Sequence, residues 1–329
     1  MKLYVRAPFS GKGLEELRRM FDTVIYEPWT ATGERYYEDE LLEHLLKEQP
    51  DALITELDRV TEKVLKDYDR LQFIGDCRGT PANIQVDACT AAGVPILCTP
   101  GRNTQAVAEM VVGLILAFYR KLLPSVQWVE DGKWVAGTTP YYLWMGNELQ
   151  RKKVGLVGFG RISRVVAKIL DGFDCDISFY DPFISGDQGH YHKRTLEEVF
   201  SESDIVSLHL PVLDTTRGMI TEPLLRSMKK DALFVNAARS ALVDYKALRS
   251  VLEEENIGGA ILDVLDSEPP TPEDASIGKL PNVLLTPHTC GATYEVTDHQ
   301  SDILVDGIRK WMAGEQLETV VYNREVLKR

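Results

Sequence analysis

The chain has 329 residues, with 37 Lys and Arg against 50 Asp and Glu, so its formal net charge is −13 at pH 7. This length predicts about two domains, at roughly 150 residues per domain. The negative charge without a basic run excludes a nucleic-acid or anionic-membrane surface, and a 44% hydrophobic share excludes intrinsic disorder and a disulfide scaffold.

Short apolar runs alternate with helical patterns along almost the whole chain. Strand-like runs form a first series at 3–6, 24–27, 52–55, 73–76 and 96–99, and a second at 153–157, 177–180, 205–210, 233–236, 260–264 and 283–286. Apolar residues at helical spacing mark 38–47, 162–170, 245–254 and 296–312. Alternating strands and helices predict an α/β fold with parallel sheets in two domains.

Three features concern the location of the protein. No apolar segment of signal-peptide length follows the first residues, so we expect a cytoplasmic protein. Residues 110–119 are apolar but too few for a bilayer, which needs about 20, and they predict a buried helix. The five cysteines include no C-x-x-C pair, which is typical of free thiols in a reducing compartment.

The segment 128–151 is rich in aromatic residues although its Gly and Pro content is typical of a loop. Its aromatic residues are Trp128, Trp134, Tyr141, Tyr142 and Trp144. Large aromatic side chains on an irregular segment need burial, either on their own domain or on another subunit. We expect them to pack on a partner subunit.

The run 153–163, K-V-G-L-V-G-F-G-R-I-S, indicates a strand, a glycine turn and a helix start. Gly158 permits the turn, and Gly160 permits a dinucleotide pyrophosphate to approach the backbone N–H groups of the helix. Ser163 stands where G-x-G-x-x-G has its third glycine, and two glycines alone are a weak signal. Asp181, 21 residues after Gly160, ends the next strand-like run, where a ribose 2′-OH acceptor is expected. Because no Arg follows it directly, we predict NAD rather than NADP; the alternative is a solvated turn residue.

Arg239, Glu268 and His288 each follow a strand-like run of the second series. The carboxyl ends of parallel strands are where α/β sheets bind ligands. Arg239 would pair with a substrate carboxylate, His288 would exchange a proton with a hydroxyl, and Glu268 would hold one imidazole nitrogen and favour its protonated form. Each residue alone is typical of a protein surface. Together, downstream of a dinucleotide loop, they predict hydride transfer between a 2-hydroxy acid and its 2-keto acid.

Several motifs carry a resemblance to a known family. They are the nucleotide loop 154–162, the run 203–211, N-A-A-R at 236–239, L-D-V with E-P at 262–264 and 268–269, and T-P-H with G-A at 286–288 and 291–292. In these motifs, and over nearly its whole length, the chain resembles the D-isomer-specific 2-hydroxyacid dehydrogenases. That family includes phosphoglycerate, glycerate and D-lactate dehydrogenases.

The resemblance implies two doubly wound parallel-sheet domains, a Rossmann-type NAD domain inserted into a flavodoxin-like substrate domain. The substrate domain would comprise 1–100 and 290–329. The NAD domain would span 101–289 and include a dimerisation segment at about 103–150. The resemblance also implies an NAD-dependent oxidoreductase that is a homodimer.

The same resemblance implies further site residues. Arg161 and Ile162 would contact the pyrophosphate, Leu210 and Pro211 the adenine, and Ala237, Asp263 and Gly291 the nicotinamide side. The loop at 75–83, with Arg78 and Gly79, would hold the substrate together with Arg239 and His288.

The chain departs from the family pattern at Ser240, where a glycine is usual, and at Arg78 in the substrate loop. Arg78 predicts either recognition of a second anionic group on the substrate or a structural salt bridge. The substrate itself stays open among hydroxypyruvate, glyoxylate, phosphohydroxypyruvate and longer sugar-acid analogues.

Two other functions and a metal site are alternatives to this prediction. An NAD(H)-sensing corepressor-like protein of the same fold would keep Arg, Glu and His, but no partner-docking tail is recognisable here. A formate dehydrogenase would pair its histidine with Gln, which Glu268 contradicts. His190 and His192 share a face if they lie on a strand, but no third ligand lies nearby in sequence, so we predict no metal.

Overall fold

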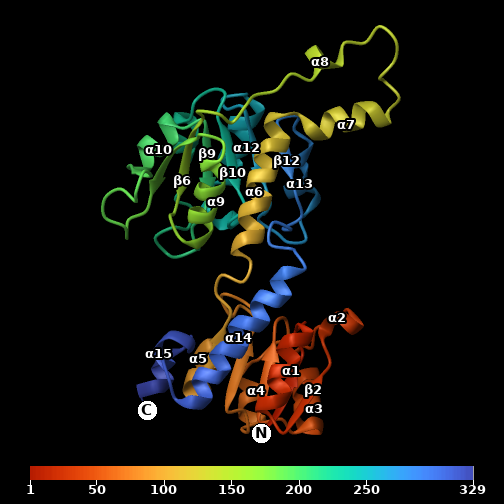
Figure 1. The fold of residues 1–329 in the computed structure, drawn as a ribbon, viewed down its shortest axis with the longest axis vertical. Coiled ribbons are helices and arrows are strands. Elements are labelled where there is room, and N and C mark those ends of the chain that lie inside the picture. The colour runs from red at the N-terminus through yellow and green to blue at the C-terminus, as the bar shows by residue number, and fades with distance from the viewer. Residues whose placement is uncertain (329) are drawn as a thin grey trace. The chain divides into compact units, whose positions relative to one another are not determined.

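The computed structural model describes residues 1–328, which form two compact units (Figure 1). The first, called unit 1, contains Met1–Asn103 together with the chain from Thr293 onward. The second, called unit 2, contains Thr104–Ala292. The chain therefore builds most of unit 1, then all of unit 2, and returns to complete unit 1.

Unit 1 contains one sheet of five parallel strands in the order β2-β1-β3-β4-β5. The strands are β1 (Lys2–Val5), β2 (Thr23–Tyr26), β3 (Ala52–Thr55), β4 (Phe73–Asp76) and β5 (Ile96–Cys98). This is the flavodoxin-like order. In the ladder Asp76 pairs with both Thr55 and Cys98, so these three strands end side by side.

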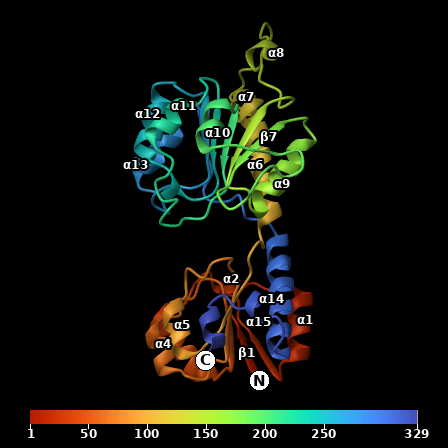
Figure 2. The ribbon, with the colours of Figure 1, turned by 90° about the vertical axis from the view of Figure 1, so that its left-hand side faces the viewer.

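Helices cover both faces of the unit 1 sheet. They are α1 (Gly11–Met20), α2 (Trp29–Thr32), α3 (Glu38–Glu48), α4 (Glu62–Asp67), α5 (Val86–Ala92), α14 (Glu295–Ala313) and α15 (Leu317–Val320), with a 3-10 turn at Arg324–Lys328. Figure 2 shows α1 and α14 on one face and α4 and α5 on the other. A Cβ on Gly75 of β4 would lie 2.9 Å from Leu304 of α14. The returning helix therefore packs directly on the sheet.

Unit 2 contains seven parallel strands in the order β12-β11-β10-β9-β6-β7-β8. They are β6 (Lys153–Val157), β7 (Asp176–Tyr180), β8 (His192–Lys193), β9 (Ile205–Leu208), β10 (Leu233–Asn236), β11 (Gly259–Leu262) and β12 (Val283–Leu285). The strand order reverses between β6 and β9. Open α/β sheets bind ligands at such a switch point, outside the carboxyl ends of the strands.

The unit 2 sheet is also covered on both faces. Its helices are α6 (Thr104–Tyr119), α7 (Leu122–Glu130), α8 (Pro140–Leu143), α9 (Arg161–Asp171), α10 (Leu196–Glu202), α11 (Glu222–Ser227), α12 (Tyr245–Glu253) and α13 (Pro272–Ala275), with 3-10 turns at Ser240–Leu242 and Ser276–Lys279. Figure 2 shows α6 and α9 on one face and α11 and α12 on the other. The buried helix predicted at 110–119 is confirmed as part of α6. Within residues 1–328, no helix has the length and apolar character needed to cross a membrane.

A segment of unit 2 formed by α7, α8 and the chain around them extends away from the body of the unit (Figure 1). We call residues 122–146 the arm. Its large apolar side chains are exposed, for example Leu123 at 56%, Trp134 at 65% and Tyr141 at 79%. Trp128 and Trp144 face each other edge to face, with ring centroids 6.2 Å apart.

The predicted α/β fold class is confirmed, and each of the eleven predicted runs overlaps a strand. Two predicted runs extend past the ends of their strands. The run at 205–210 continues beyond β9, which ends at Leu208, and the run at 260–264 continues beyond β11, which ends at Leu262. His209 and Asp263 therefore lie just beyond the sheet, although the apolar pattern continues past them. The strand β8 was missed because two residues are too few to show a period.

Candidate active site

The turn between β6 and α9 is built by two glycines with different requirements. Gly158 has a φ of +88°, and a Cβ on it would lie 2.8 Å from the carbonyl oxygen of His209. Gly160 is the N-cap residue directly before α9, and a Cβ there would meet none of the described protein atoms within 4 Å. Ser163, at the third-glycine position, is buried and donates its hydroxyl to the Gly158 carbonyl oxygen. The serine thus stabilises the turn.

Asp181 directly follows β7 and is held in place by the backbone. Its Oδ2 accepts from the N–H of Phe159 at 2.9 Å, inside the glycine turn, and its Oδ1 accepts from the N–H of Phe183 at 2.9 Å. Each carboxylate oxygen can accept more than one hydrogen bond. The carboxylate is therefore fixed beside the turn and can still accept from a ligand.

The glycine turn fits a dinucleotide pyrophosphate. No side chain caps the first turn of α9, so its N–H groups and the positive end of the helix dipole can bind an anion. The space beside Gly160 leaves room for that anion at the backbone. Arg161 and Ile162 form the first turn of this helix.

Arg239 follows β10 on a turn that Asn236 shapes. The buried Asn236 accepts from the N–H of Ala238 (3.1 Å) and donates to the carbonyl oxygen of Arg239 (3.1 Å). It also donates to the hydroxyl of Tyr245 (3.4 Å), which in turn donates to the carbonyl oxygen of Val264 (2.6 Å). These bonds tie the turn after β10 to the end of β11 and leave the Arg239 side chain exposed.

Asp263, just after β11, holds the segment that carries His288. It is 1% exposed. Its Oδ1 accepts from the hydroxyl of Thr286 (2.6 Å) and the N–H of Thr289 (2.8 Å), and its Oδ2 accepts from the N–H of Cys290 (2.9 Å). His288 lies inside this clamp with a φ of +55°, which is strained for a residue other than glycine. The carboxylate therefore supports a backbone conformation that histidine alone would avoid.

His288 and Glu268 form an ion-pair contact. The Nδ1 of His288 lies 2.6 Å from the Oε2 of Glu268, and the two side chains are 44% and 42% exposed. Glu268 engages Nδ1, and within residues 1–328 the Nε2 of His288 has no hydrogen-bond partner, so it can exchange a proton with a ligand. A carboxylate–imidazole pair of this kind is typical of general acid–base catalysis.

Four predicted cofactor residues of unit 2 follow other strands: Leu210 and Pro211 follow β9, Ala237 follows β10, and Gly291 lies beyond β12. Leu210 and Pro211 lie two and three residues beyond the end of β9. Between them and the strand, His209 places its Nε2 3.0 Å from the hydroxyl of Ser207, and desolvation lowers the pKa of His209 to about 4. His209 is therefore neutral at pH 7.

The structure brings together part of the predicted set. Glu268 contacts His288, Asp263 holds the His288 segment, and Arg239 follows the neighbouring strand β10. Arg78 and Gly79 lie in unit 1, in the loop after β4. His190 and His192 contact different carboxylates, those of Asp171 and Asp187, and only His192 lies on a strand.

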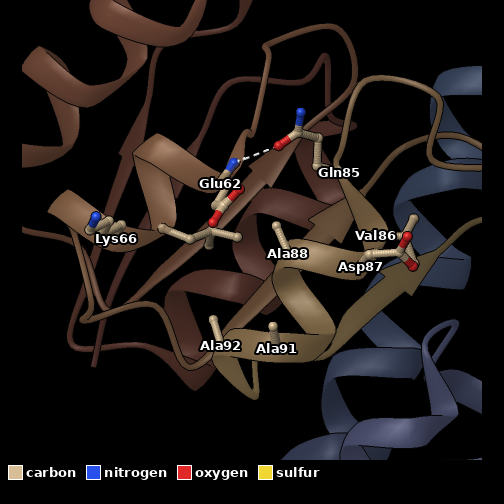
Figure 3. Close-up of a pocket in the computed structure, with 9 residues that line it drawn as sticks. Glu62, Lys66, Gln85, Val86, Asp87, Ala88, Ala91 and Ala92 are labelled. Carbon is tan, nitrogen blue, oxygen red and sulfur yellow. Dashed lines mark hydrogen bonds between the residues drawn. The ribbon is translucent and has the colours of Figure 1, made fainter.

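A shallow surface pocket of unit 1 lies between α4 and α5 (Figure 3). Its lining includes Glu62, Lys66 and Gln85 together with three alanines. The backbone N–H of Glu62 donates to the side-chain oxygen of Gln85 at 2.6 Å. The lining contains none of the predicted site residues, so we assign it no function.

Two supporting residues, Asn236 and Tyr245, were not predicted to have a role in the site. Asn236 was recognised only as part of a motif, and Tyr245 was not singled out. The bond from Tyr245 to Val264 spans 19 residues, and Asn236 bonds to the backbone of its own turn, so the periodicity of apolar residues reveals neither. Asp263 was predicted for the nicotinamide, but its clamp on the His288 segment was not expected.

A parallel sheet with a glycine turn at its switch point, and an acid–base pair on the same edge, is the architecture of dinucleotide-dependent oxidoreductases. Residues 112–290 match the model of a protein family described as "D-isomer specific 2-hydroxyacid dehydrogenase, NAD binding domain". The chain belongs to this family and is an oxidoreductase with a nicotinamide-dinucleotide-binding domain.

Two relatives and one solved structure illustrate the similarity. The chain is 44% identical to the "Putative 2-hydroxyacid dehydrogenase YoaD" of Bacillus subtilis (strain 168), over 100% of this chain and 96% of the relative. It is 35% identical to the glyoxylate reductase of Thermofilum pendens, over 99% and 96%. The crystal structure of an NADPH-dependent glyoxylate/hydroxypyruvate reductase from Sinorhizobium meliloti superposes with a TM-score of 0.78 at 25% identity, covering 95% of each chain.

Proposed function

We propose that this chain transfers hydride between a nicotinamide cofactor and a small D-2-hydroxy acid or its 2-keto acid, with hydroxypyruvate, glyoxylate or a phosphoglycerate-like acid as substrate. The observation that carries the proposal is the contact of 2.6 Å between His288 and Glu268 on the sheet edge that also bears the glycine turn. The names of the relatives, glyoxylate reductases among them, support this substrate class.

Arg239, His288 and Glu268, at the carboxyl edge of the unit 2 sheet, each have a defined role in this reaction. The cofactor supplies or accepts the hydride. Arg239 pairs with the carboxylate of the substrate through its planar guanidinium and orients the carbonyl carbon. In reduction His288 donates its Nε2 proton to the carbonyl oxygen, and in oxidation it removes that proton from the hydroxyl. Glu268 holds Nδ1 and stabilises the imidazolium.

A panel of 2-keto acids tests the reaction. Purified protein is mixed with NADH or NADPH and with glyoxylate, hydroxypyruvate, phosphohydroxypyruvate and a longer sugar-acid analogue, and the absorbance of the reduced cofactor is followed. Turnover of at least one acid is expected. Cofactor binding with no turnover of any acid would contradict the enzyme and favour the NAD(H)-sensing alternative.

We propose NAD as the preferred cofactor because Asp181 is fixed beside the glycine turn. A carboxylate there accepts hydrogen bonds from the ribose diol and repels a 2′-phosphate. The Sinorhizobium relative is NADPH-dependent by its name, so the family contains both preferences. Asp181→Ala is expected to lower the ratio of kcat/KM with NADH to that with NADPH, and Asp187→Ala is the matched control. A wild-type enzyme that prefers NADPH would contradict the assignment.

The remaining cofactor and substrate residues are proposed by position. Arg161 and Ile162 begin α9 and are assigned to the pyrophosphate, and Leu210 and Pro211 to the adenine. Ala237, Asp263 and Gly291 are assigned to the nicotinamide side. Arg78 and Gly79 are assigned to the substrate, which makes unit 1 the substrate domain.

We propose that the arm mediates a homodimer. Its exposed apolar side chains, including Trp134, Tyr141 and Tyr142, form a surface that water solvates poorly. Light scattering on the wild type is expected to give twice the mass of 37.0 kDa. A variant with Tyr141→Ser and Trp134→Ser is expected to shift toward the monomer. A monomeric wild type at micromolar concentration would contradict the proposal.

A cytoplasmic location is proposed from the cysteines. All five are free thiols, which suits a reducing compartment. Cell fractionation with an antibody against the chain tests this location.

A further inference from the structure

The carboxyl edge of the unit 1 sheet carries several charged side chains, and most of them are paired. Arg6, after β1, lies 3.4 Å from Asp58, and these side chains are 1% and 0% exposed. Arg102, after β5, lies 2.7 Å from Glu56, which also accepts from the indole N–H of Trp29 at 2.9 Å. Each of these buried or half-buried charges has a partner of opposite sign.

Asp76 and Arg78 are the exception on this edge. Asp76 ends β4 and is 0% exposed, and within residues 1–328 neither of its carboxylate oxygens has a hydrogen-bond partner. The side-chain amide of Asn83 is near enough to Asp76 to favour its charged form, but the hydrogen bond that its geometry supports is to the carbonyl oxygen of Asp58, at 3.2 Å. Arg78, two residues further, is half-buried, and its guanidinium forms no hydrogen bond or ion pair in the described part of the chain. The predicted alternative of a structural salt bridge at Arg78 is therefore not found.

An unpartnered buried carboxyl is costly and calls for a specific explanation. Burial raises the pKa of Asp76 to about 8, and the nearby carboxylate of Glu56 acts in the same direction. Arg78, Arg102 and Asn83 oppose the shift, and the half-buried thiol of Cys98 is close to the same carboxyl. At pH 7 Asp76 is thus mainly protonated and does not neutralise the charge of Arg78.

A cation without a counter-charge, on the ligand-binding edge of a parallel sheet, favours an anion. We propose that Arg78 binds a second anionic group of the substrate, and that the neutral carboxyl of Asp76 keeps the Arg78 charge available for it. The preferred substrate is then a 2-keto acid with two acidic groups. This inference rests on the proposed function and narrows its substrate class.

The two residues have different tasks. Arg78 contacts the anion, as a guanidinium does with a carboxylate or a phosphate. Asp76 has no exposed surface and acts through Arg78, so it is a positioning residue. When Asp76 ionises above about pH 8, its negative charge competes with the substrate for Arg78. The affinity for the second anionic group is therefore expected to fall with rising pH.

Steady-state kinetics at pH 7 test the role of Arg78. The substrates are glyoxylate, which has one acidic group, and oxaloacetate and phosphohydroxypyruvate, which have a carboxylate or a phosphate as the second. Arg78→Ala is expected to lower kcat/KM for a two-anion substrate about 10- to 100-fold, mainly through KM, because a hydrogen bond to a charged group is lost. The value for glyoxylate is expected to change less than about threefold.

The control variant is Arg70→Ala, which removes a unit 1 arginine that pairs with Asp51 instead. It is expected to leave all three substrates unaffected. The comparison of oxaloacetate with phosphohydroxypyruvate decides whether the second anion is a carboxylate or a phosphate. An equal loss with glyoxylate and the two-anion substrates in Arg78→Ala would overturn the inference and leave the proposed function intact.

A pH series tests the role of Asp76. The ratio of KM for oxaloacetate to KM for glyoxylate is measured from pH 6 to 9.5, so that pH effects common to both substrates cancel. The ratio is expected to rise above pH 8 in the wild type and to stay flat in Asp76→Asn. The same rise in both proteins would overturn the role of Asp76.

If no acid is turned over, the proposed function fails. The anion subsite at Arg78 can then still be tested by measuring the binding of the same acids. Oxaloacetate is then expected to raise the melting temperature of the wild type more than glyoxylate does, and Arg78→Ala is expected to remove this difference. No difference in the wild type would overturn the subsite.

Discussion

Charged side chains at the carboxyl edges of the two sheets differ in their hydrogen bonding. On the unit 2 edge, Asp263 accepts three hydrogen bonds and Glu268 contacts His288. On the unit 1 edge, Asp76 is equally buried but unbonded, and the guanidinium of Arg78 has no partner within residues 1–328. Both edges are formed by parallel strands with similar ends, so the fold alone does not cause the difference.

The difference distinguishes two kinds of charged residue. Asp263 and Glu268 fix the positions of neighbouring groups, whereas Arg78 has a charge that can bind a ligand. A fully bonded carboxylate fixes its surroundings, which suits a proton transfer that needs reacting atoms at a set distance. An unbonded buried carboxyl lowers stability and is retained where it serves binding. The four predictions that follow test this separation.

The largest effect is expected for His288→Ala on the unit 2 edge. Loss of the proton donor is expected to reduce kcat/KM about 10³-fold or more, while the dissociation constant of NADH stays within about threefold. Stopped-flow turnover and fluorescence titration with NADH measure the two quantities. Arg239→Ala is expected to behave in the same way, and near-normal activity in both variants would sink the assignment of the site.

The same substitution at Asp263 and Asp76 is expected to have opposite effects on stability. Asp263→Asn replaces an acceptor of three hydrogen bonds and is expected to cost about 2–4 kcal/mol. Asp76→Asn is expected to stabilise the protein. The folded state keeps the Asp76 proton up to about pH 8 while the unfolded chain releases it near pH 4, so wild-type stability falls as the pH rises through this range.

The gain from Asp76→Asn should therefore be absent near pH 4 and reach at most about 5 kcal/mol at pH 8. Urea unfolding at pH 5 and pH 8 measures it. Destabilisation by Asp76→Asn at pH 8 would mean that Asp76 has a bonded role like that of Asp263.

Substitutions of the two glycines of the nucleotide turn are expected to have different effects, one on stability and the other on NADH binding. Gly158→Ala places a Cβ 2.8 Å from a carbonyl oxygen at a positive φ, and should cost about 2–3 kcal/mol. Gly160→Ala meets no protein atom and should leave the melting temperature nearly unchanged while weakening NADH binding. Unchanged NADH affinity in Gly160→Ala would place the pyrophosphate elsewhere.

The smallest effect is expected at His209. Its folded-state pKa of about 4 lies below the usual 6.5, so the unfolded chain takes up a proton first as the pH falls. Wild-type stability is therefore expected to drop between pH 6.5 and pH 5, by about 2 kcal/mol. His209→Gln should remove this contribution in urea unfolding, and an unchanged pH dependence would show that His209 titrates normally.

Much of the unit 2 edge could be predicted from the sequence because its signals are local. The turn at Gly158 and Gly160 and the positions of Arg239, Glu268 and His288 after strands all follow from short runs of residues. The bond from Tyr245 to Val264 and the three bonds to Asp263 join residues 19 to 27 positions apart. Their partners are set by strand order, which a single sequence does not display.

The sequence alone determined the fold class, the family resemblance and the chemical types of the site residues, because period, turn glycines and strand-end polar residues are encoded within a few positions. Only the tertiary structure decided which charges are satisfied. Asp76 and Asp263 both follow or end an apolar strand and look alike in sequence. Their environments differ because hydrogen bonding and burial depend on neighbours that the packed sheet brings together.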